Sequence, residues 1–265
     1  MTLLQANLAI ALLAAHVLAD FVFQTEKGVE AKKRVWVLGV HCLVASTLSY
    51  LFSGLWSVWP ILLVVFATHV VMDFIKRRYM SPTLRSFLID QAVHLAVIGA
   101  LIVAVPYITD PVSRGYWYDE VSVHFYRWLL GLAGFLMATY AGAVLVGLAI
   151  RPLQPQTARD AVTDGTNGLP VVKSSLEGFP QGGRTIGLLE RGLIFVFVAA
   201  GQPVAIGFLI AAKSILRFGE VGRGAARKDV EYIIIGTLLS FFIAVVVSYL
   251  TRLGFREYGV TWPAS

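Results

Sequence analysis

A His-x-x-x-Asp-Phe motif occurs twice in the chain, each time inside an apolar stretch. The first is HVLADF at residues 16–21 and the second is HVVMDF at residues 69–74. Residues four apart share one face of a helix, so each motif would present an imidazole beside a carboxylate. Such groups are costly to bury in an apolar environment without a partner. Both motifs therefore predict a polar site buried among helices.

The two motifs are related by a constant offset, which extends to a further pair of histidines. His16 and His69 are 53 residues apart, and so are His41 and His94. The chain has only five histidines, which makes chance a poor explanation. The offset predicts a duplicated two-helix unit, whose copies share one orientation and are related by a pseudo-twofold axis along the membrane normal.

The His and Asp residues of the four predicted helices all lie close to the basic residues at the helix ends. A helix rises 1.5 Å per residue, so these His and Asp side chains fall in one shallow layer near the basic end of a four-helix bundle. This layer holds four imidazoles and three carboxylates, predicted as metal ligands: His16, Asp20, His41, His69, Asp73, Asp90 and His94.

Metal binding would relieve the repulsion among three carboxylates, which otherwise must be protonated. Helical bundles hold di-metal centres with carboxylate and imidazole ligands of this kind. Seven ligands exceed one tetrahedral zinc, so we expect two divalent transition-metal ions, zinc first, with iron or manganese also suited. A proton or ion relay and a purely structural polar network are the alternatives.

Asp90 has no counterpart at the offset of 53, because residue 37 is Val37. This carboxylate is therefore the predicted general base. Gln24 and Gln91 either donate hydrogen bonds to the ligands or are amides at the rim. Lys76 neutralises Asp73, contacts an anionic substrate, or is an ordinary lysine that reaches the membrane surface. Lys213 and Arg217 form either a phosphate-binding wall or a contact with lipid headgroups.

The composition is that of an integral membrane protein. The 265 residues are 57% hydrophobic and only 14% charged, and the mean hydropathy is +0.72. An ordinary soluble domain carries about 25% charged residues. In a membrane protein, a net charge of +6 is typical of basic cytoplasmic loops that face anionic lipid headgroups. No nucleic-acid partner is expected. A single cysteine excludes a disulfide framework within the chain.

Apolar segments of about 20 residues predict an all-α polytopic fold. The predicted spans are 3–24, 35–53, 58–75, 87–108, 125–150 and 230–251. The stretch 186–217 is either one kinked helix or a hairpin that turns back near Gly201-Gln202-Pro203, and the charges around it favour the hairpin.

Two regions are predicted, with the metal site in the first. Residues 1–110 form the duplicated four-helix bundle, and residues 111–265 add three to four transmembrane helices and a polar loop at 151–184. The positive-inside rule places the N-terminus outside.

The segments HVLADFVFQ, HVVMDFIK and DQAVH resemble an uncharacterised bacterial inner-membrane protein family, domain-of-unknown-function family 3307. The later segments GGRTIGLLERGLIFV and GFLIAAKSILRFGE resemble the C-terminal half of that family. The resemblance implies a multi-pass protein of the bacterial inner membrane. Its His/Asp pattern is similar to that of predicted membrane-bound metal-dependent hydrolases, which is a likeness of pattern alone.

The leading hypothesis is a membrane-embedded metal-dependent hydrolase that works near the cytoplasmic leaflet. Its expected substrate is a lipid-linked or amphipathic phosphoester or amide, because basic residues surround the site. A transporter or proton relay that uses the same cluster is the second hypothesis, and a metal-stabilised membrane scaffold for a protein partner is the third.

Overall fold

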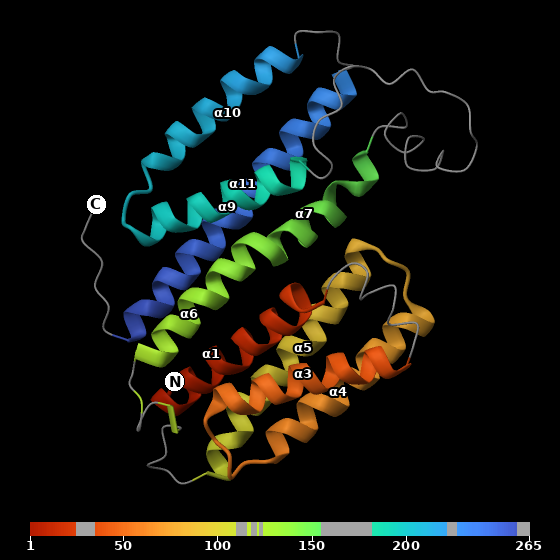
Figure 1. The fold of residues 1–265 in the computed structure, drawn as a ribbon, viewed down its shortest axis with the longest axis vertical. Helices are drawn as coiled ribbons and strands as arrows, with labels where there is room; N and C mark the ends of the chain where they lie inside the picture. The colour runs from red at the N-terminus through yellow and green to blue at the C-terminus, as the bar shows by residue number, and fades with distance from the viewer. Residues whose placement is uncertain are drawn as a thin grey trace. The chain divides into compact units, whose positions relative to one another are not determined.

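The computed structural model describes residues 1–24, 35–109, 116–117, 121, 124–154, 182–221 and 227–258. Within these ranges every regular element is a helix, which confirms the predicted all-α class (Figure 1). The chain divides into two compact units. The first comprises Met1–Met137 and the end of α11 from Leu253 on, and the second runs from Ala138 to Arg252.

The helices of the first unit agree closely with the predicted spans. They are α1 (Leu3–Val17), the π-helix η1 (Leu18–Val22), α3 (Val35–Ser53), α4 (Pro60–Tyr79), α5 (Leu84–Ala104), the 3-10 helix η2 (Val105–Tyr107) and α6 (His124–Leu136). Local chemistry sets several of the starts. Thr2 and Gln5 form a capping box before α1, and Pro60 occupies the first turn of α4, where its missing N–H costs nothing.

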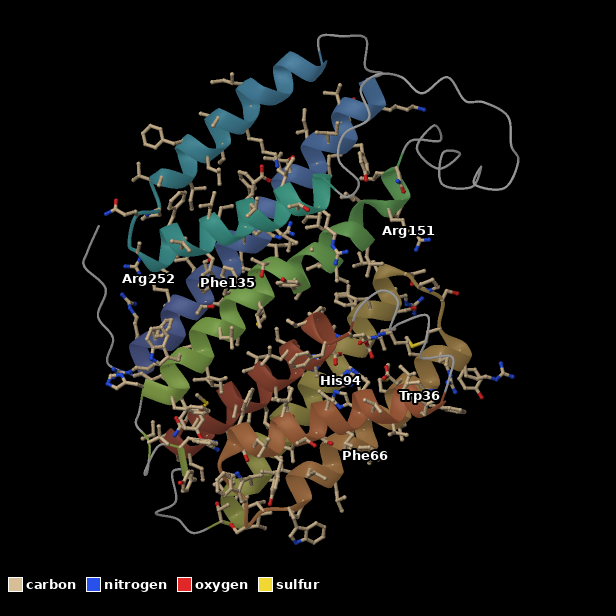
Figure 2. All side chains as sticks on the ribbon, in the orientation of Figure 1. Trp36, Phe66, His94, Phe135, Arg151 and Arg252 are labelled. Carbon is tan, nitrogen blue, oxygen red and sulfur yellow. The ribbon has the colours of Figure 1, made fainter. Side chains whose placement is uncertain are left out.

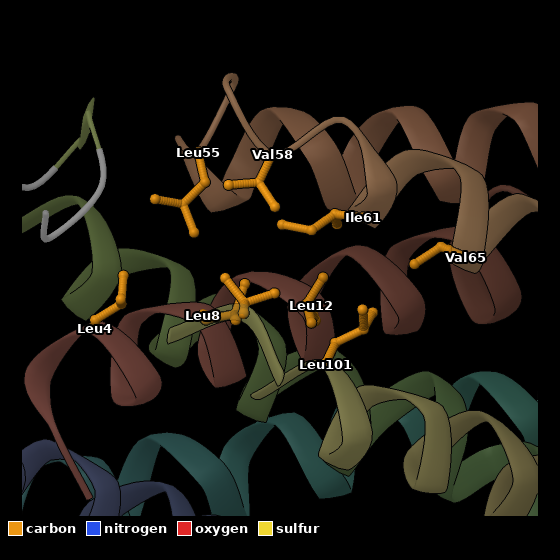
Figure 3. Packing of buried hydrophobic residues seen from close by; sticks show 9 residues of the cluster. Leu4, Leu8, Leu12, Leu55, Val58, Ile61, Val65 and Leu101 are labelled. Atoms are coloured by element: carbon orange, nitrogen blue, oxygen red, sulfur yellow. The ribbon is translucent and has the colours of Figure 1, made fainter. Parts of the chain in front are cut away.

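Helix α1 packs against α3, α5 and α6, and α4 packs against both α3 and α5. An apolar core fills the half of this assembly that lies toward the N-terminal end of α1 (Figure 3). Its buried members are Leu4, Leu8, Leu12, Leu55, Val58, Ile61, Val65, Leu101 and Val105. Between membrane helices such side chains contribute by van der Waals packing, because lipid tails are as apolar as they are.

The turn between α3 and α4 closes the same end of the unit with aromatic residues. Gly54 has φ 64°, and a Cβ at this position would lie 2.9 Å from Tyr116 N and from the Trp117 ring. Glycine avoids both the steric clash and the left-handed strain. Trp56 stacks on Tyr116, and the indole of Trp117 donates a hydrogen bond to the Leu51 carbonyl. Tryptophan and tyrosine are enriched at membrane interfaces.

The second unit contains the remaining helices. They are η4 (Met137–Ala141) from Ala138 on, α7 (Gly142–Ile150), η5 (Arg151–Leu153), α9 (Gly182–Ala199), α10 (Ala205–Val221) and most of α11 (Arg227–Glu257). The chain turns back between α9 and α10, where Gly201 has φ 72°, so the stretch 186–217 is two helices joined by a turn (Figure 1). The polar loop was predicted at 151–184, but α9 already begins at Gly182. Residues 155–181 of this loop lie outside the described residues.

Charged side chains are buried inside the second unit. The Arg191 guanidinium donates hydrogen bonds to the Thr139 carbonyl, 3.2 Å away, and to Ser240 Oγ, 2.8 Å away. Lys213 forms an ion pair with Glu190, which ties α10 to α9. These contacts satisfy polar groups that would otherwise be costly among apolar helices.

Among the described residues, five helices are long and apolar enough to cross a membrane, which indicates a multi-pass membrane protein. They are Leu3–Val22, Trp36–Ser53, Leu84–Tyr107, His124–Leu153 and Val230–Arg256. The predicted span 58–75 corresponds to α4, which is 20 residues long but falls outside this set. Its last turns carry Asp73 and three basic residues, so charge rather than length sets it apart.

Candidate metal centre

The predicted ligands converge in the half of the first unit opposite the apolar core. His16 and Asp20 come from the end of α1 and from η1, and His41 from the start of α3. Helix α4 adds His69 and Asp73 near its end, and α5 adds Asp90 and His94 near its start. His94 points into the space between these helices, whereas Trp36 at the start of α3 points away from them (Figure 2). The predicted common layer is therefore realised in space.

The imidazoles stand against one another. The His94 ring centroid lies 4.3 Å from that of His69 and 5.1 Å from that of His16. The same three rings line a small cavity among α1, α3, α4 and α5. All three side chains are buried, and Asp90 is only 1% exposed. Three histidines and a carboxylate are thus held away from water at one point.

Five buried polar atoms of this cluster have no hydrogen-bond partner. They are His16 Nδ1, Asp20 Oδ1, His69 Nε2, Asp90 Oδ1 and His94 Nε2. In the described part of the chain, one other buried side-chain atom shares this condition, Arg127 Nε. Unsatisfied buried polar groups are rare in proteins and each needs a physical explanation. Their convergence in one cluster indicates a group that accepts lone pairs, such as a metal ion.

The second nitrogen of each of these imidazoles is held by a hydrogen bond. His69 Nδ1 lies 2.9 Å from the Val65 carbonyl, and His94 Nδ1 lies 2.8 Å from the Asp90 carbonyl. His16 Nε2 lies 3.1 Å from Gln91 Oε1. Because each of these oxygens accepts, the facing nitrogen carries the proton and the other nitrogen keeps its lone pair. Metal-binding histidines are oriented in this way.

Two groups of three residues bring one potential ligand atom each within 4.8 Å of the others. The first group, called the histidine triad below, is His16, Asp20 and His69. The second, called the aspartate triad, is Asp20, Asp90 and His94. Asp20 belongs to both. Two adjacent positions with a shared carboxylate are an arrangement that suits a dinuclear centre.

The backbone around Asp20 differs from that around Asp73, although the two motifs match in sequence. Residues Leu18–Val22 form a π-helix, in which the Phe23 N–H donates to the Leu18 carbonyl at 2.9 Å. Asp73 lies instead in the regular α-helix α4. Single π-helical turns occur frequently at functional sites. Here the π-helix carries the carboxylate that both triads share.

His41 and Asp73 lie beside the triads rather than within them. His41 Nε2 is 3.4 Å from Asp20 Oδ1 and 3.9 Å from Asp73 Oδ2. His41 therefore lies between the two motif carboxylates. The structure brings all seven predicted residues together but gives these two a peripheral place.

Lys76 contacts a different carboxylate from the one expected. Its ammonium pairs with Asp90 Oδ2 at 2.5 Å, not with Asp73. Asp90 Oδ2 also receives a weak contact from Gln91 Nε2 at 3.4 Å, so Gln91 connects Asp90 with His16. Asp90 Oδ1 has no hydrogen-bond partner and lies 3.6 Å from His94 Nδ1. Sequence spacing did not predict that Lys76 contacts one oxygen of Asp90, because this contact depends on the packing of α4 against α5.

The other predicted neighbours are Gln24, Lys213 and Arg217. Gln24 follows η1, is half-buried, and makes none of the hydrogen bonds described above for the cluster. Lys213 belongs to the second unit and pairs with Glu190. The Arg217 side chain lies outside the described residues.

Comparison with known proteins agrees with the resemblance seen in the motifs. Residues 8–118 match the model of a family described as a protein of unknown function (DUF3307). The matched range contains all seven His and Asp residues of the cluster. It ends before the second unit, so the C-terminal resemblance stays a prediction. No curated protein and no solved structure gives a significant match.

Proposed function

We propose that the chain is a membrane-embedded, metal-dependent hydrolase whose centre is the His/Asp cluster of the first unit. The convergence of five buried, unpartnered ligand atoms supports this proposal most strongly. A purely structural polar network would be expected to satisfy its own hydrogen bonds, because an unmade buried bond costs about 1–3 kcal/mol. The cluster instead leaves one lone pair on each of three imidazoles.

The ligand set favours divalent transition metals. Imidazole with carboxylate suits zinc, iron and manganese, and we place zinc first. The histidine triad and the aspartate triad would each hold one ion, with Asp20 between them. When bound, such ions make a water nucleophilic near neutral pH and stabilise developing negative charge. Asp90 is the proposed base, although its place in the aspartate triad also makes it a ligand.

The setting of the centre suggests an amphipathic substrate. The ends of α4 and α5 that carry the cluster also carry the basic residues Lys76, Arg77, Arg78 and Arg85. Exposed apolar side chains accompany them at the same end of α4, among them Phe74, Ile75 and Tyr79. A positive rim beside an apolar surface fits an anionic lipid headgroup or a lipid-linked phosphoester, and an amide is the alternative substrate.

The two ends of the first unit differ in composition, and this difference supports the proposed topology. Basic residues lie at the end that carries the His/Asp cluster, and tryptophans lie at the opposite end, at the turn between α3 and α4. The positive-inside rule then places the cluster at the cytoplasmic leaflet of a bacterial inner membrane, with the N-terminus outside. The first four helices form the duplicated bundle in this proposal, and the 53-residue offset supports it.

A transport function has less support from the packing. The half of the first unit beyond the cluster is filled by the apolar core, which contains no ionisable residue. Hydroxyls near it bond to their own helices, as Ser49 Oγ does to the Ala45 carbonyl at 2.8 Å. A transported ion needs polar groups through the full depth of the membrane. The apolar core provides none, and the buried Asn7 on the N-terminal part of α1 is already bonded to the Tyr258 hydroxyl.

Metal analysis of the purified protein in detergent tests the proposal. The wild type should carry a transition metal, and the double variant His16→Ala, His69→Ala should lose nearly all of it, because it removes both imidazoles of one triad. His124→Ala is the matched control, since His124 is exposed and belongs to neither triad. A folded wild type that takes up no metal after incubation with zinc, iron or manganese would refute the metal centre.

A further inference from the structure

The two metal positions differ in their charge environment. The histidine triad combines one carboxylate with two imidazoles, and the cation of Lys76 does not touch it. The aspartate triad contains Asp90, whose Oδ2 already bears the Lys76 ammonium at 2.5 Å. A divalent ion at the second position would share the Asp90 carboxylate with the Lys76 ammonium and would be repelled by its positive charge.

The charges of the two triads lead to the same conclusion. Asp20 and Asp90 contribute −2 and Lys76 contributes +1, so the triads and Lys76 together carry −1 when the imidazoles are neutral. One divalent ion changes this charge to +1. A second ion would raise it to +3 in a buried site, which is strongly unfavourable without an added anion.

Lys76 can respond to such an anion. It is 38% exposed, whereas its partner Asp90 is buried, so the lysine reaches the cluster from the rim. A phosphate group has the charge to attract this ammonium and to balance the second ion. Movement of Lys76 to the phosphate would also free Asp90 for the aspartate triad.

We propose that the histidine triad holds one resident ion and that the second ion binds together with an anionic group of the substrate, with Lys76 enforcing this order. The inference rests on the proposed function and deepens it, because it selects an anionic phosphoester over a neutral amide. By linkage, phosphate and the second ion must then strengthen each other's binding to the same extent.

Cobalt(II) titration in detergent, with and without inorganic phosphate, tests this order. The wild type should bind one equivalent of cobalt without phosphate and a second with it, followed by the visible spectrum and by equilibrium dialysis. In Lys76→Met the second ion should bind at least tenfold more tightly without phosphate, because the competing cation is gone. Arg78→Met removes the same charge from an exposed position of the same helix and should behave as the wild type.

Asp90→Asn provides an independent variant, expected to keep the first ion and to lose the phosphate-dependent second ion. The order is overturned if the wild type binds both ions equally without phosphate. It is also overturned if Lys76→Met binds the second ion no better than the wild type does, or more weakly. Failure of the wild type to bind any cobalt would instead refute the proposed metal centre, so the two failures are distinguishable.

Discussion

Replacing Asp20 by asparagine should abolish metal binding, whereas the same change at Asp73 should not. The two residues occupy equivalent places in matching motifs. Asp20 belongs to both triads, but Asp73 belongs to neither and lies 3.9 Å from His41 Nε2. A carboxamide is a poorer ligand than a carboxylate and carries no charge. The geometry therefore predicts different effects for the two variants, whereas the matching motifs predict equal effects.

The size of the effect can be estimated from outer-shell substitutions, which weaken metal binding by about 10–100-fold. Loss of a direct ligand should reach at least the upper end of that range. At a free zinc concentration of about 100 times Kd, one bound ion stabilises the folded state by about 2.7 kcal/mol. A hundredfold weaker site would retain about 0.4 kcal/mol of this stabilisation. Asp20→Asn should thus lose nearly all of the zinc-dependent stability.

The assay compares thermal unfolding in detergent with zinc and with a chelator, for the wild type and both variants. Only the zinc-dependent shift in Tm is compared, which cancels the effect of each substitution on the metal-free protein. Metal content after dialysis gives the second readout. Equal losses in Asp20→Asn and Asp73→Asn would refute the reasoning from the triads and restore the symmetric ligand set.

Two further predictions concern the rest of the chain. Lys213→Met should destabilise the fold by about 3–5 kcal/mol, because it leaves the buried Glu190 without its cation, and adding Glu190→Gln should restore much of the lost Tm; an unchanged Tm would assign Lys213 no structural role. In a cysteine-free background, cysteine at the exposed position Trp59 should react with an impermeant reagent applied to intact cells, and cysteine at the exposed position Tyr79 only after lysis; the reverse pattern would place the cluster at the outer leaflet.

Helix positions were largely predictable because apolar length and charge determine them. The span 35–53 coincides with α3, and the other predicted spans differ from the helices mainly at their ends. Those ends depend on caps and on amphipathic extensions, which hydropathy does not register; α5, for example, starts three residues early because Thr83 caps it. The break between α9 and α10 was also indicated by its Gly and Pro residues.

The membership of the site was predictable, but its internal arrangement was not. Periodicity and depth brought all seven His and Asp residues to one place, as the spacing of four residues and the 53-residue offset predicted. The pairing of Lys76 with Asp90 required knowledge of how α4 faces α5. The two hydrogen-bonded carbonyls behind His69 and His94 belong to the helix backbone, which no side-chain pattern reveals.

The contrast between the two motifs shows how a repeated sequence can form an asymmetric centre. A strictly symmetric arrangement would give two like positions, each with its own motif aspartate. The π-helix at Leu18–Val22 breaks this equivalence, because it occurs around Asp20 while Asp73 remains in a regular helix. In the proposed centre, one carboxylate would be shared, and Asp90, which has no counterpart, would complete the second position beside the charge of Lys76. Two unlike positions could then divide the proposed work of binding a resident ion and of receiving a charged substrate, which two identical positions could not do.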